Sequence, residues 1–174
     1  IISKNIIKAR SEKKITRVDE LVKIIEKSKR KNLSKKINPS TKTFQALRIF
    51  VNKEISELIT GIINATKLLK PGGKIIIISF HSIEDKIIKF FFKNYSKNKS
   101  KPSRYFPEEK NENLALFEKY TNKVVKPSHD EIIINKPSRS AKLRYATRSK
   151  NKFVYPSNLV QKFNTYLEIE ATNV

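Results

Sequence analysis

The side chains best suited to chemistry gather in one short stretch of this 174-residue chain, residues 79–85, which read SFHSIED. The imidazole of His81 can donate or accept a hydrogen bond near neutral pH. The carboxylates of Glu84 and Asp85 can accept a hydrogen bond from an exocyclic amine such as that of cytosine. The same two acids also suit a structural role, because a helix dipole favours negative charge in the first turn. We therefore treat His81, Glu84 and Asp85 as candidate catalytic residues, with helix capping as the alternative.

The sequence around this stretch predicts that it lies at the edge of a sheet. Four consecutive isoleucines, Ile75–Ile78, follow a Pro-Gly-Gly turn and predict a short strand buried on both faces, as in the centre of a parallel sheet. One long helix from Thr41 to Leu69 is expected before the turn, and another, with Ser82 as its N-cap, after the strand. Ligands of open parallel sheets bind outside the carboxyl ends of the strands. Ser79 and Ser82 are therefore candidate substrate contacts.

Other kinds of site find little support in the sequence. His129, in a Pro-Ser-His-Asp-Glu segment, is expected on the surface in the first turn of a short helix. The chain has two His and no Cys, and these form no recognisable metal-ligand spacing. Neither Ser79 nor Ser82 has the flanking glycines that a nucleophile elbow requires. A hydrolase that combines His81 with an acid is therefore the weakest functional hypothesis.

The charge balance points to a polyanionic partner. The chain carries 38 Lys and Arg against 16 Asp and Glu, a formal net charge of +22, and nucleic acid is the commonest partner of so basic a protein. The alternative is a merely solvated basic surface. Residues 139–144, RSAKLR, suit phosphate contact, or else form an edge strand whose charges prevent pairing with another sheet.

The rest of the chain predicts short elements joined by polar segments. In chain order these are two helices and a basic connector over 1–37, a surface excursion over 96–114, a strand within 115–125, a helix over 128–134, a strand over 141–147 and a tail helix over 159–167. No apolar run approaches the roughly 20 residues of a membrane span, and no secretory signal pattern opens the chain. We therefore expect a cytoplasmic protein.

Three stretches, taken together and in order, resemble one protein family. They are residues 38–54, NPSTKTFQALRIFVNKE; residues 71–85, PGGKIIIISFHSIED; and residues 135–144, NKPSRSAKLR. All three resemble segments of the bacterial 16S ribosomal RNA cytosine-N4 methyltransferases. Each motif alone is suggestive, and the three in this order are specific.

The resemblance implies an α/β fold. It would be the second half of a Rossmann-like S-adenosylmethionine-dependent methyltransferase sheet, preceded by the end of an inserted helical domain. On that template, residues 1–37 are the end of the helical substrate-recognition domain, 38–150 are the second half of the catalytic domain, and 151–174 are a tail that matches nothing in the family.

The implied reaction is transfer of a methyl group from S-adenosylmethionine to the exocyclic N4 of a cytidine in 16S ribosomal RNA of the small subunit. The family's methyl-donor loop belongs to the first half of the domain, and this chain has only 3 Gly, so we expect no donor-binding residues here and no activity from this chain alone. The candidate RNA contacts are Ser79, Ser82, Arg48, Arg139, Ser140, Lys142 and Arg144. The competing hypothesis is a basic RNA-binding protein without catalytic activity.

Overall fold

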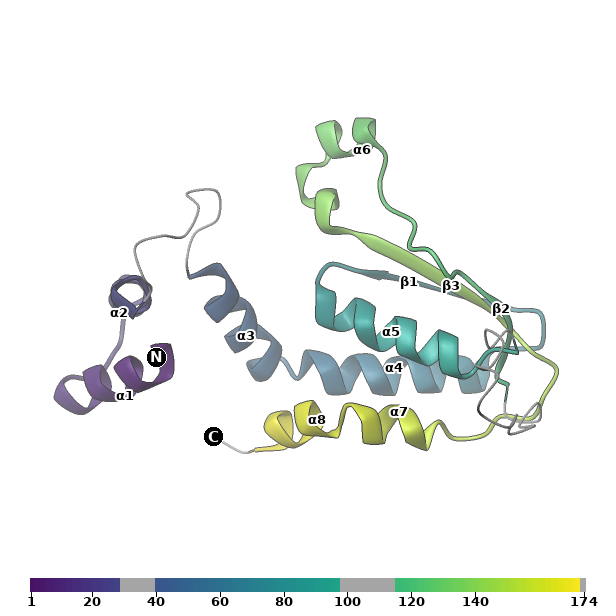
Figure 1. The fold of residues 1–174 in the computed structure, drawn as a ribbon, viewed down its shortest axis with the longest axis horizontal. Coiled ribbons are helices and arrows are strands. Elements are labelled where there is room, and N and C mark those ends of the chain that lie inside the picture. Colours follow the sequence, from purple (N-terminus) through teal and green to yellow (C-terminus); the bar gives the residue numbers. More distant parts are fainter. Residues whose placement is uncertain (29–39, 98–114, 173–174) are drawn as a thin grey trace, which may run out of the picture. The chain divides into compact units, whose positions relative to one another are not determined.

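The computed structural model describes residues 1–28, 40–97 and 115–172, which belong to two compact units, Ile1–Glu54 and Ile55–Val174 (Figure 1). The predicted domain boundary between residues 37 and 38 lies outside the described residues, and so does most of the predicted surface excursion over 96–114. In the described parts of the chain, no helix is long and apolar enough to cross a membrane.

The first unit consists of helices α1 (Ile2–Glu12), α2 (Val18–Ser28) and α3 (Thr41–Val51). Helices α1 and α2 pack against each other and confirm the two helices predicted before residue 37. Ile25 of α2 is fully buried, and the Asn5 side-chain amide donates to Ser28 Oγ at 2.8 Å.

The single long helix predicted from Thr41 to Leu69 is wrong. The structure has two helices there, because α3 ends at Val51 and α4 spans Glu54–Leu68. Between them, Lys53 adopts a positive φ of 53°, in the left-handed region that ends a right-handed helix. The apolar spacing continues through this break, so periodicity alone did not reveal it.

The second unit contains a three-stranded sheet of β1 (Lys74–Ser79), β2 (Phe117–Tyr120) and β3 (Lys142–Arg148), in the order β1-β3-β2. Both predicted later strands are confirmed. Strand β3 lies in the middle and runs antiparallel to both neighbours, so β1 and β2 are parallel to each other. The alternative that β3 is an edge strand is therefore wrong.

Among the described residues, strand β1 forms an edge of the sheet, whereas its isoleucines predicted a central strand buried on both faces. It pairs with β3 only, antiparallel, and forms one edge of the sheet that the structure describes. Ile75 is buried, but Ile76 and Ile78 are 61% and 55% exposed, because no described element covers that face. The Pro-Gly-Gly turn before it depends on Gly72, whose φ of 79° favours glycine.

Helix α5 (Ser82–Asn94) packs on the sheet and provides much of the apolar core of the second unit (Figure 1). The rings of Phe91 and Phe92 lie edge-on to Phe117 of β2, with centroids 5.3 and 5.2 Å apart. Ile87 and Ile88 complete the buried face of α5. This packing fixes the beginning of α5 next to the end of β1, where the candidate catalytic residues lie.

The remaining elements are α6 (His129–Ile134), the 3-10 helix η2 (Lys136–Ser140), α7 (Ser157–Lys162) and α8 (Asn164–Ala171). The predicted helix after Ser128 is confirmed, and Ser128 Oγ accepts from the backbone N–H of Glu131 at 3.1 Å. The single tail helix predicted over 159–167 is wrong, because α7 and α8 meet at Phe163. Phe163 is 2% exposed, and its ring lies edge-on to Phe90 of α5 at 5.6 Å.

Candidate functional site

His81 lies between the end of β1 and the first turn of α5, and its side chain caps that helix. Its Nδ1 accepts from the backbone N–H of Glu84 at 3.4 Å, and Glu84 Oε2 accepts from the backbone N–H groups of Phe80 and His81 at 2.9 and 3.3 Å. These reciprocal bonds form a capping box. The prediction that Ser82 is the N-cap is wrong: Ser82 is the first helical residue and is exposed.

The His81 imidazole is therefore held in a defined orientation. The residue is 9% exposed, and its Nε2 lies 3.3 Å from Glu84 Oε1. Because Nδ1 accepts a backbone hydrogen bond, the neutral ring carries its proton on Nε2. This geometry suits an imidazole that orients neighbouring groups. In the same arrangement, the Glu84 carboxylate is used to cap the helix.

Asp85 is held by two basic residues of β3. Arg144 Nε donates to Asp85 Oδ1 at 2.7 Å and Nη2 donates to Oδ2 at 3.4 Å, while Lys142 Nζ lies 3.6 Å from Oδ2. Arg144 Nη1 also donates to the carbonyl oxygen of Asn122 at 3.2 Å. Burial acts to raise the pKa of Asp85, but Arg144 and Lys142 outweigh it and hold the pKa below its usual value. Asp85 is thus an ionised link between α5 and β3, a position that favours positioning over proton transfer.

The structure brings part of the predicted set together at one end of the sheet. Ser79 and Lys142 are paired in the β1–β3 register, and Ser79 Oγ donates to the Lys142 carbonyl oxygen at 3.4 Å. Ser79 is 1% exposed, so it supports the turn between β1 and α5 from inside the fold and does not present its hydroxyl to solvent. Arg144, expected to contact phosphate, is instead 5% exposed and engaged with Asp85.

The other predicted RNA contacts are accessible. Arg139 and Ser140 are exposed on η2, directly before β3. Arg48 is exposed on α3 in the first unit, where its guanidinium bonds Glu54 at 2.6 and 3.1 Å. His129 is exposed as the first residue of α6, as predicted.

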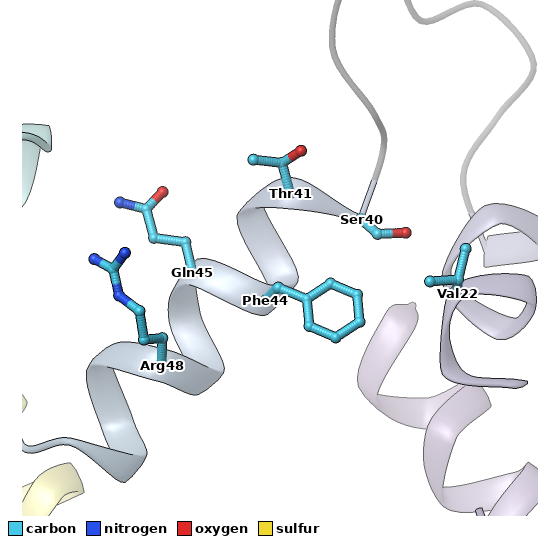
Figure 2. A pocket seen from close by; sticks show the side chains of 6 residues that line it. All are labelled: Val22, Ser40, Thr41, Phe44, Gln45 and Arg48. Carbon is cyan, nitrogen blue, oxygen red and sulfur yellow. The ribbon is translucent and has the colours of Figure 1, made fainter. Parts of the chain in front are cut away.

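An open hollow of about 510 Å³ lies beside α3 in the first unit. It is lined by Val22, Ser40, Thr41, Phe44, Gln45 and Arg48 (Figure 2). The Phe44 ring points toward Val22, whereas Gln45 and Arg48 project from another side of α3. The aromatic ring thus lies apart from the amide and guanidinium groups, and Arg48 as an RNA contact stays a prediction.

Two buried charges escaped the sequence reasoning. Arg148, at the end of β3, is 5% exposed and donates to the carbonyl oxygens of Leu116 and Asn151 at 2.9 Å each. Burial lowers the pKa of its guanidinium. Glu170 of the tail is also 5% exposed. Neither residue stands in a motif, and only tertiary contacts identify them.

The chain matches the MraW methylase family over residues 1–149. It is 43% identical over 143 residues to the ribosomal RNA small subunit methyltransferase H of Ehrlichia chaffeensis, an alignment that covers 82% of this chain and 45% of that protein. The proteins of the same name from Ehrlichia canis and Xanthobacter autotrophicus are 45% and 41% identical over 146 and 148 residues. These cover 82% and 85% of this chain, and 45% and 42% of the relatives.

The chain thus spans about half the length of the curated relatives it matches. The matched region contains α1 to β3 and includes the capping box of His81 and the Asp85–Arg144 pair, whereas helices α7 and α8 lie beyond it. The resemblance noticed in three separate motifs therefore extends through the intervening elements, and the chain belongs to the MraW methylase family.

Proposed function

We propose that the intact protein carrying this chain methylates the exocyclic N4 of a cytidine in 16S ribosomal RNA, with S-adenosylmethionine as methyl donor. The observation that carries the proposal is the match of residues 1–149 to the MraW methylase family, whose relatives are named as methyltransferases of small-subunit ribosomal RNA. A cytoplasmic location, where ribosomal subunits are modified, is part of the proposal.

The topology of the second unit supports a place in a larger Rossmann-like sheet. Strands β1 and β2 are parallel, and α5 connects them, as in the βαβ units of such sheets. The outer edge of β1 is unpaired among the described residues, and the exposed Ile76 and Ile78 form an apolar face beside it. In our proposal, further strands and helices of the intact protein pair with this edge and cover this face.

The proposed organisation follows from that placement. Residues 1–37 would end the helical substrate-recognition domain, and 38–150 would form the second half of the catalytic domain. Residues 151–174 would be a tail added to it. The boundary between the two compact units, at residues 54 and 55, comes from packing and divides the proposed catalytic half within its first helices.

The glycines of this chain do not suit a cradle for the methyl donor. A Cβ added to Gly73 would meet Leu69 Cγ at 2.8 Å and the Lys70 carbonyl oxygen at 2.9 Å. The lack of a side chain at Gly73 therefore serves the close packing of the turn itself. Gly72 and Gly73 also precede β1, whereas ligands of such sheets bind beyond the carboxyl ends of the strands. We therefore propose that another part of the intact protein holds the donor.

This chain would contribute substrate binding and orientation. A cytosine amine is a weak nucleophile and must leave its stack to be reached, so the enzyme has to hold the base in line with the donor. The turn carrying His81 and Ser82 lies at the carboxyl end of β1, held by the capping box and by Asp85 bound to Arg144. The net charge of +22 would bind the RNA backbone.

The intact protein tests this assignment through matched histidine variants. His81→Ala is expected to lower kcat for methyl transfer to small-subunit RNA by at least about tenfold, whereas His129→Ala changes it by less than about twofold. The product is identified as N4-methylcytidine by mass spectrometry of digested RNA. Equal activity of the two variants would place the site elsewhere, and methylation at another atom would overturn the reaction.

A non-catalytic RNA-binding protein is the second candidate, favoured by the charge and by the absence of a donor cradle at the described glycines. Calorimetry separates the two. The 174-residue chain is expected to bind RNA and not S-adenosylmethionine, while the intact protein binds both. An intact protein that binds RNA but neither binds the donor nor transfers methyl groups would favour the second candidate.

A further inference from the structure

The residue that precedes helix α4 has no side-chain acceptor with which to cap it. The first backbone N–H groups of a helix have no intrahelical acceptor, and a preceding Ser, Thr, Asp or Asn normally supplies one. Here the residue before α4 is Lys53, whose side chain has no acceptor atom. The acceptor comes instead from the far end of the chain, where Glu170 lies on α8.

The Glu170 carboxylate accepts three hydrogen bonds at the beginning of α4. Its Oε1 accepts from the backbone N–H of Ile55 at 3.0 Å, and its Oε2 accepts from the backbone N–H and hydroxyl of Ser56 at 2.8 and 2.7 Å. Glu170 is only 5% exposed. Bonds from backbone donors to a charged, desolvated carboxylate are among the stronger hydrogen bonds in proteins.

The break before α4 runs against the local sequence. Apolar residues keep helical spacing from α3 into α4, as in Leu47, Val51 and Ile55, which favours one continuous helix. Lys53 interrupts it with a φ of 53°, a conformation that costs free energy in any residue with a Cβ. The Glu170 carboxylate, which is bound two residues after Lys53, is one interaction that offsets this cost, beside the Arg48–Glu54 ion pair that spans the break.

The tail that carries Glu170 is firmly packed in the second unit. Leu159 of α7 is fully buried, and Phe163 stacks edge-on against Phe90 of α5. Burial raises the pKa of the hydroxyl of Tyr95, the residue that follows α5, and this hydroxyl bonds the backbone of Leu159 and Asn158. The tail lies beyond residue 149, where the match to the family ends.

We propose that the tail is a latch, in which Glu170 captures the beginning of α4 and keeps the chain interrupted at Asn52 and Lys53. Without the carboxylate, residues 41–68 revert to the continuous helix that their sequence favours. The element therefore has two conformations, and the tail decides between them. This inference concerns the conformation of the chain and does not depend on the proposed methyl transfer.

Lys53→Gly distinguishes the two conformations, because glycine has opposite effects on them. Glycine adopts a positive φ without steric cost, so it stabilises the interrupted form. Glycine is unfavourable inside a helix, so it destabilises the continuous form. Hydrogen–deuterium exchange of peptides covering residues 50–57 measures both effects in the 174-residue chain.

With Glu170 in place, Lys53→Gly is expected to slow this exchange about fivefold. In the Glu170→Ala background, the same substitution should accelerate it about fivefold. Glu168→Ala is the matched control, because Glu168 is exposed on the same helix and its carboxylate accepts only from the Asn164 side chain among the hydrogen bonds described. Lys53→Gly should slow exchange in that background as in the native chain.

An effect of Lys53→Gly with the same sign with and without Glu170 would overturn the latch. Glu170→Gln covers the case in which the alanine variant loosens the whole tail, because glutamine keeps the size of the side chain and one acceptor oxygen. In the Glu170→Gln background, Lys53→Gly is expected to slow hydrogen–deuterium exchange less than in the native chain, but not to accelerate it. If Lys53→Gly slowed exchange as much in that background as in the native chain, the proposal would also be overturned.

Discussion

The ion pair of Asp85 and Arg144 predicts an asymmetric response to removal of its two partners. The Arg144 side chain is 6% exposed, and the Asp85 side chain is 16% exposed. Asp85→Asn leaves a guanidinium that cannot lose its proton buried beside a neutral amide. Removing one partner of a buried pair in this way costs about 3–5 kcal/mol in the free energy of unfolding.

Arg144→Met leaves the less buried partner. Asp85 keeps Lys142 at 3.6 Å and some contact with water, so we expect a smaller loss of about 1–2 kcal/mol. Urea unfolding followed by circular dichroism measures both variants, and a loss of 3 kcal/mol should lower the midpoint by about 1.5 M. Arg139→Met is the matched control, because Arg139 is exposed on η2 and should change stability by less than about 0.5 kcal/mol.

The pH dependence provides a second check of the same pair. Because folding lowers the pKa of Asp85 from 3.8, its contribution to stability is fully present above that value and is lost as pH falls through the lower folded pKa. The stability gap between the native chain and Asp85→Asn should therefore narrow only in strong acid. A gap that is already closed at neutral pH, or a larger loss in Arg144→Met than in Asp85→Asn, would refute this reasoning.

Three further predictions concern RNA binding, the exposed sheet face and the tail. Affinity for RNA is expected to fall about a hundredfold or more between about 50 and 200 mM salt, because the net charge of +22 favours phosphate contacts, and a salt-independent affinity would contradict this. The double substitution Ile76→Thr and Ile78→Thr should reduce aggregation measured by light scattering, because both side chains are more than half exposed. It should change the free energy of unfolding by less than about 0.5 kcal/mol per site, and unchanged aggregation would show that this face is not responsible for it. Phe163→Ala should cost about 3–5 kcal/mol in urea unfolding, because the ring is 2% exposed, and a loss below about 1 kcal/mol would mean that the tail is not part of the core.

The candidate site shows where sequence reasoning succeeds and where it stops. The stretch from Ser79 to Asp85 could be located because a strand pattern, a polar cluster and a helix pattern follow one another within it. Helix capping was the alternative to a catalytic role for Glu84, and the structure places Glu84 in a capping box. The partner of Asp85 was not predictable, because Arg144 is 59 residues away and its charge suited RNA equally well.

The sequence by itself determined most of the local structure. Periodicity and capping signals predicted α5, α6 and the three strands, because neighbouring residues are sufficient to define a turn, a cap or an apolar face. The family resemblance likewise depended on residue types in order. Charge alone predicted a polyanionic partner, since the formal net charge is summed over residue types and does not depend on the fold.

Tertiary structure alone decided which of these local preferences prevailed. Four isoleucines favour a strand, but whether Ile76 and Ile78 are buried depends on what covers the sheet, and the described chain leaves them exposed. The apolar stripe from α3 to α4 favours one helix, yet the chain is interrupted at Lys53, and the carboxylate of Glu170 binds the donors at the new helix start. A contact across more than 100 residues leaves no local pattern, because its free energy arises only when the fold brings the two groups together.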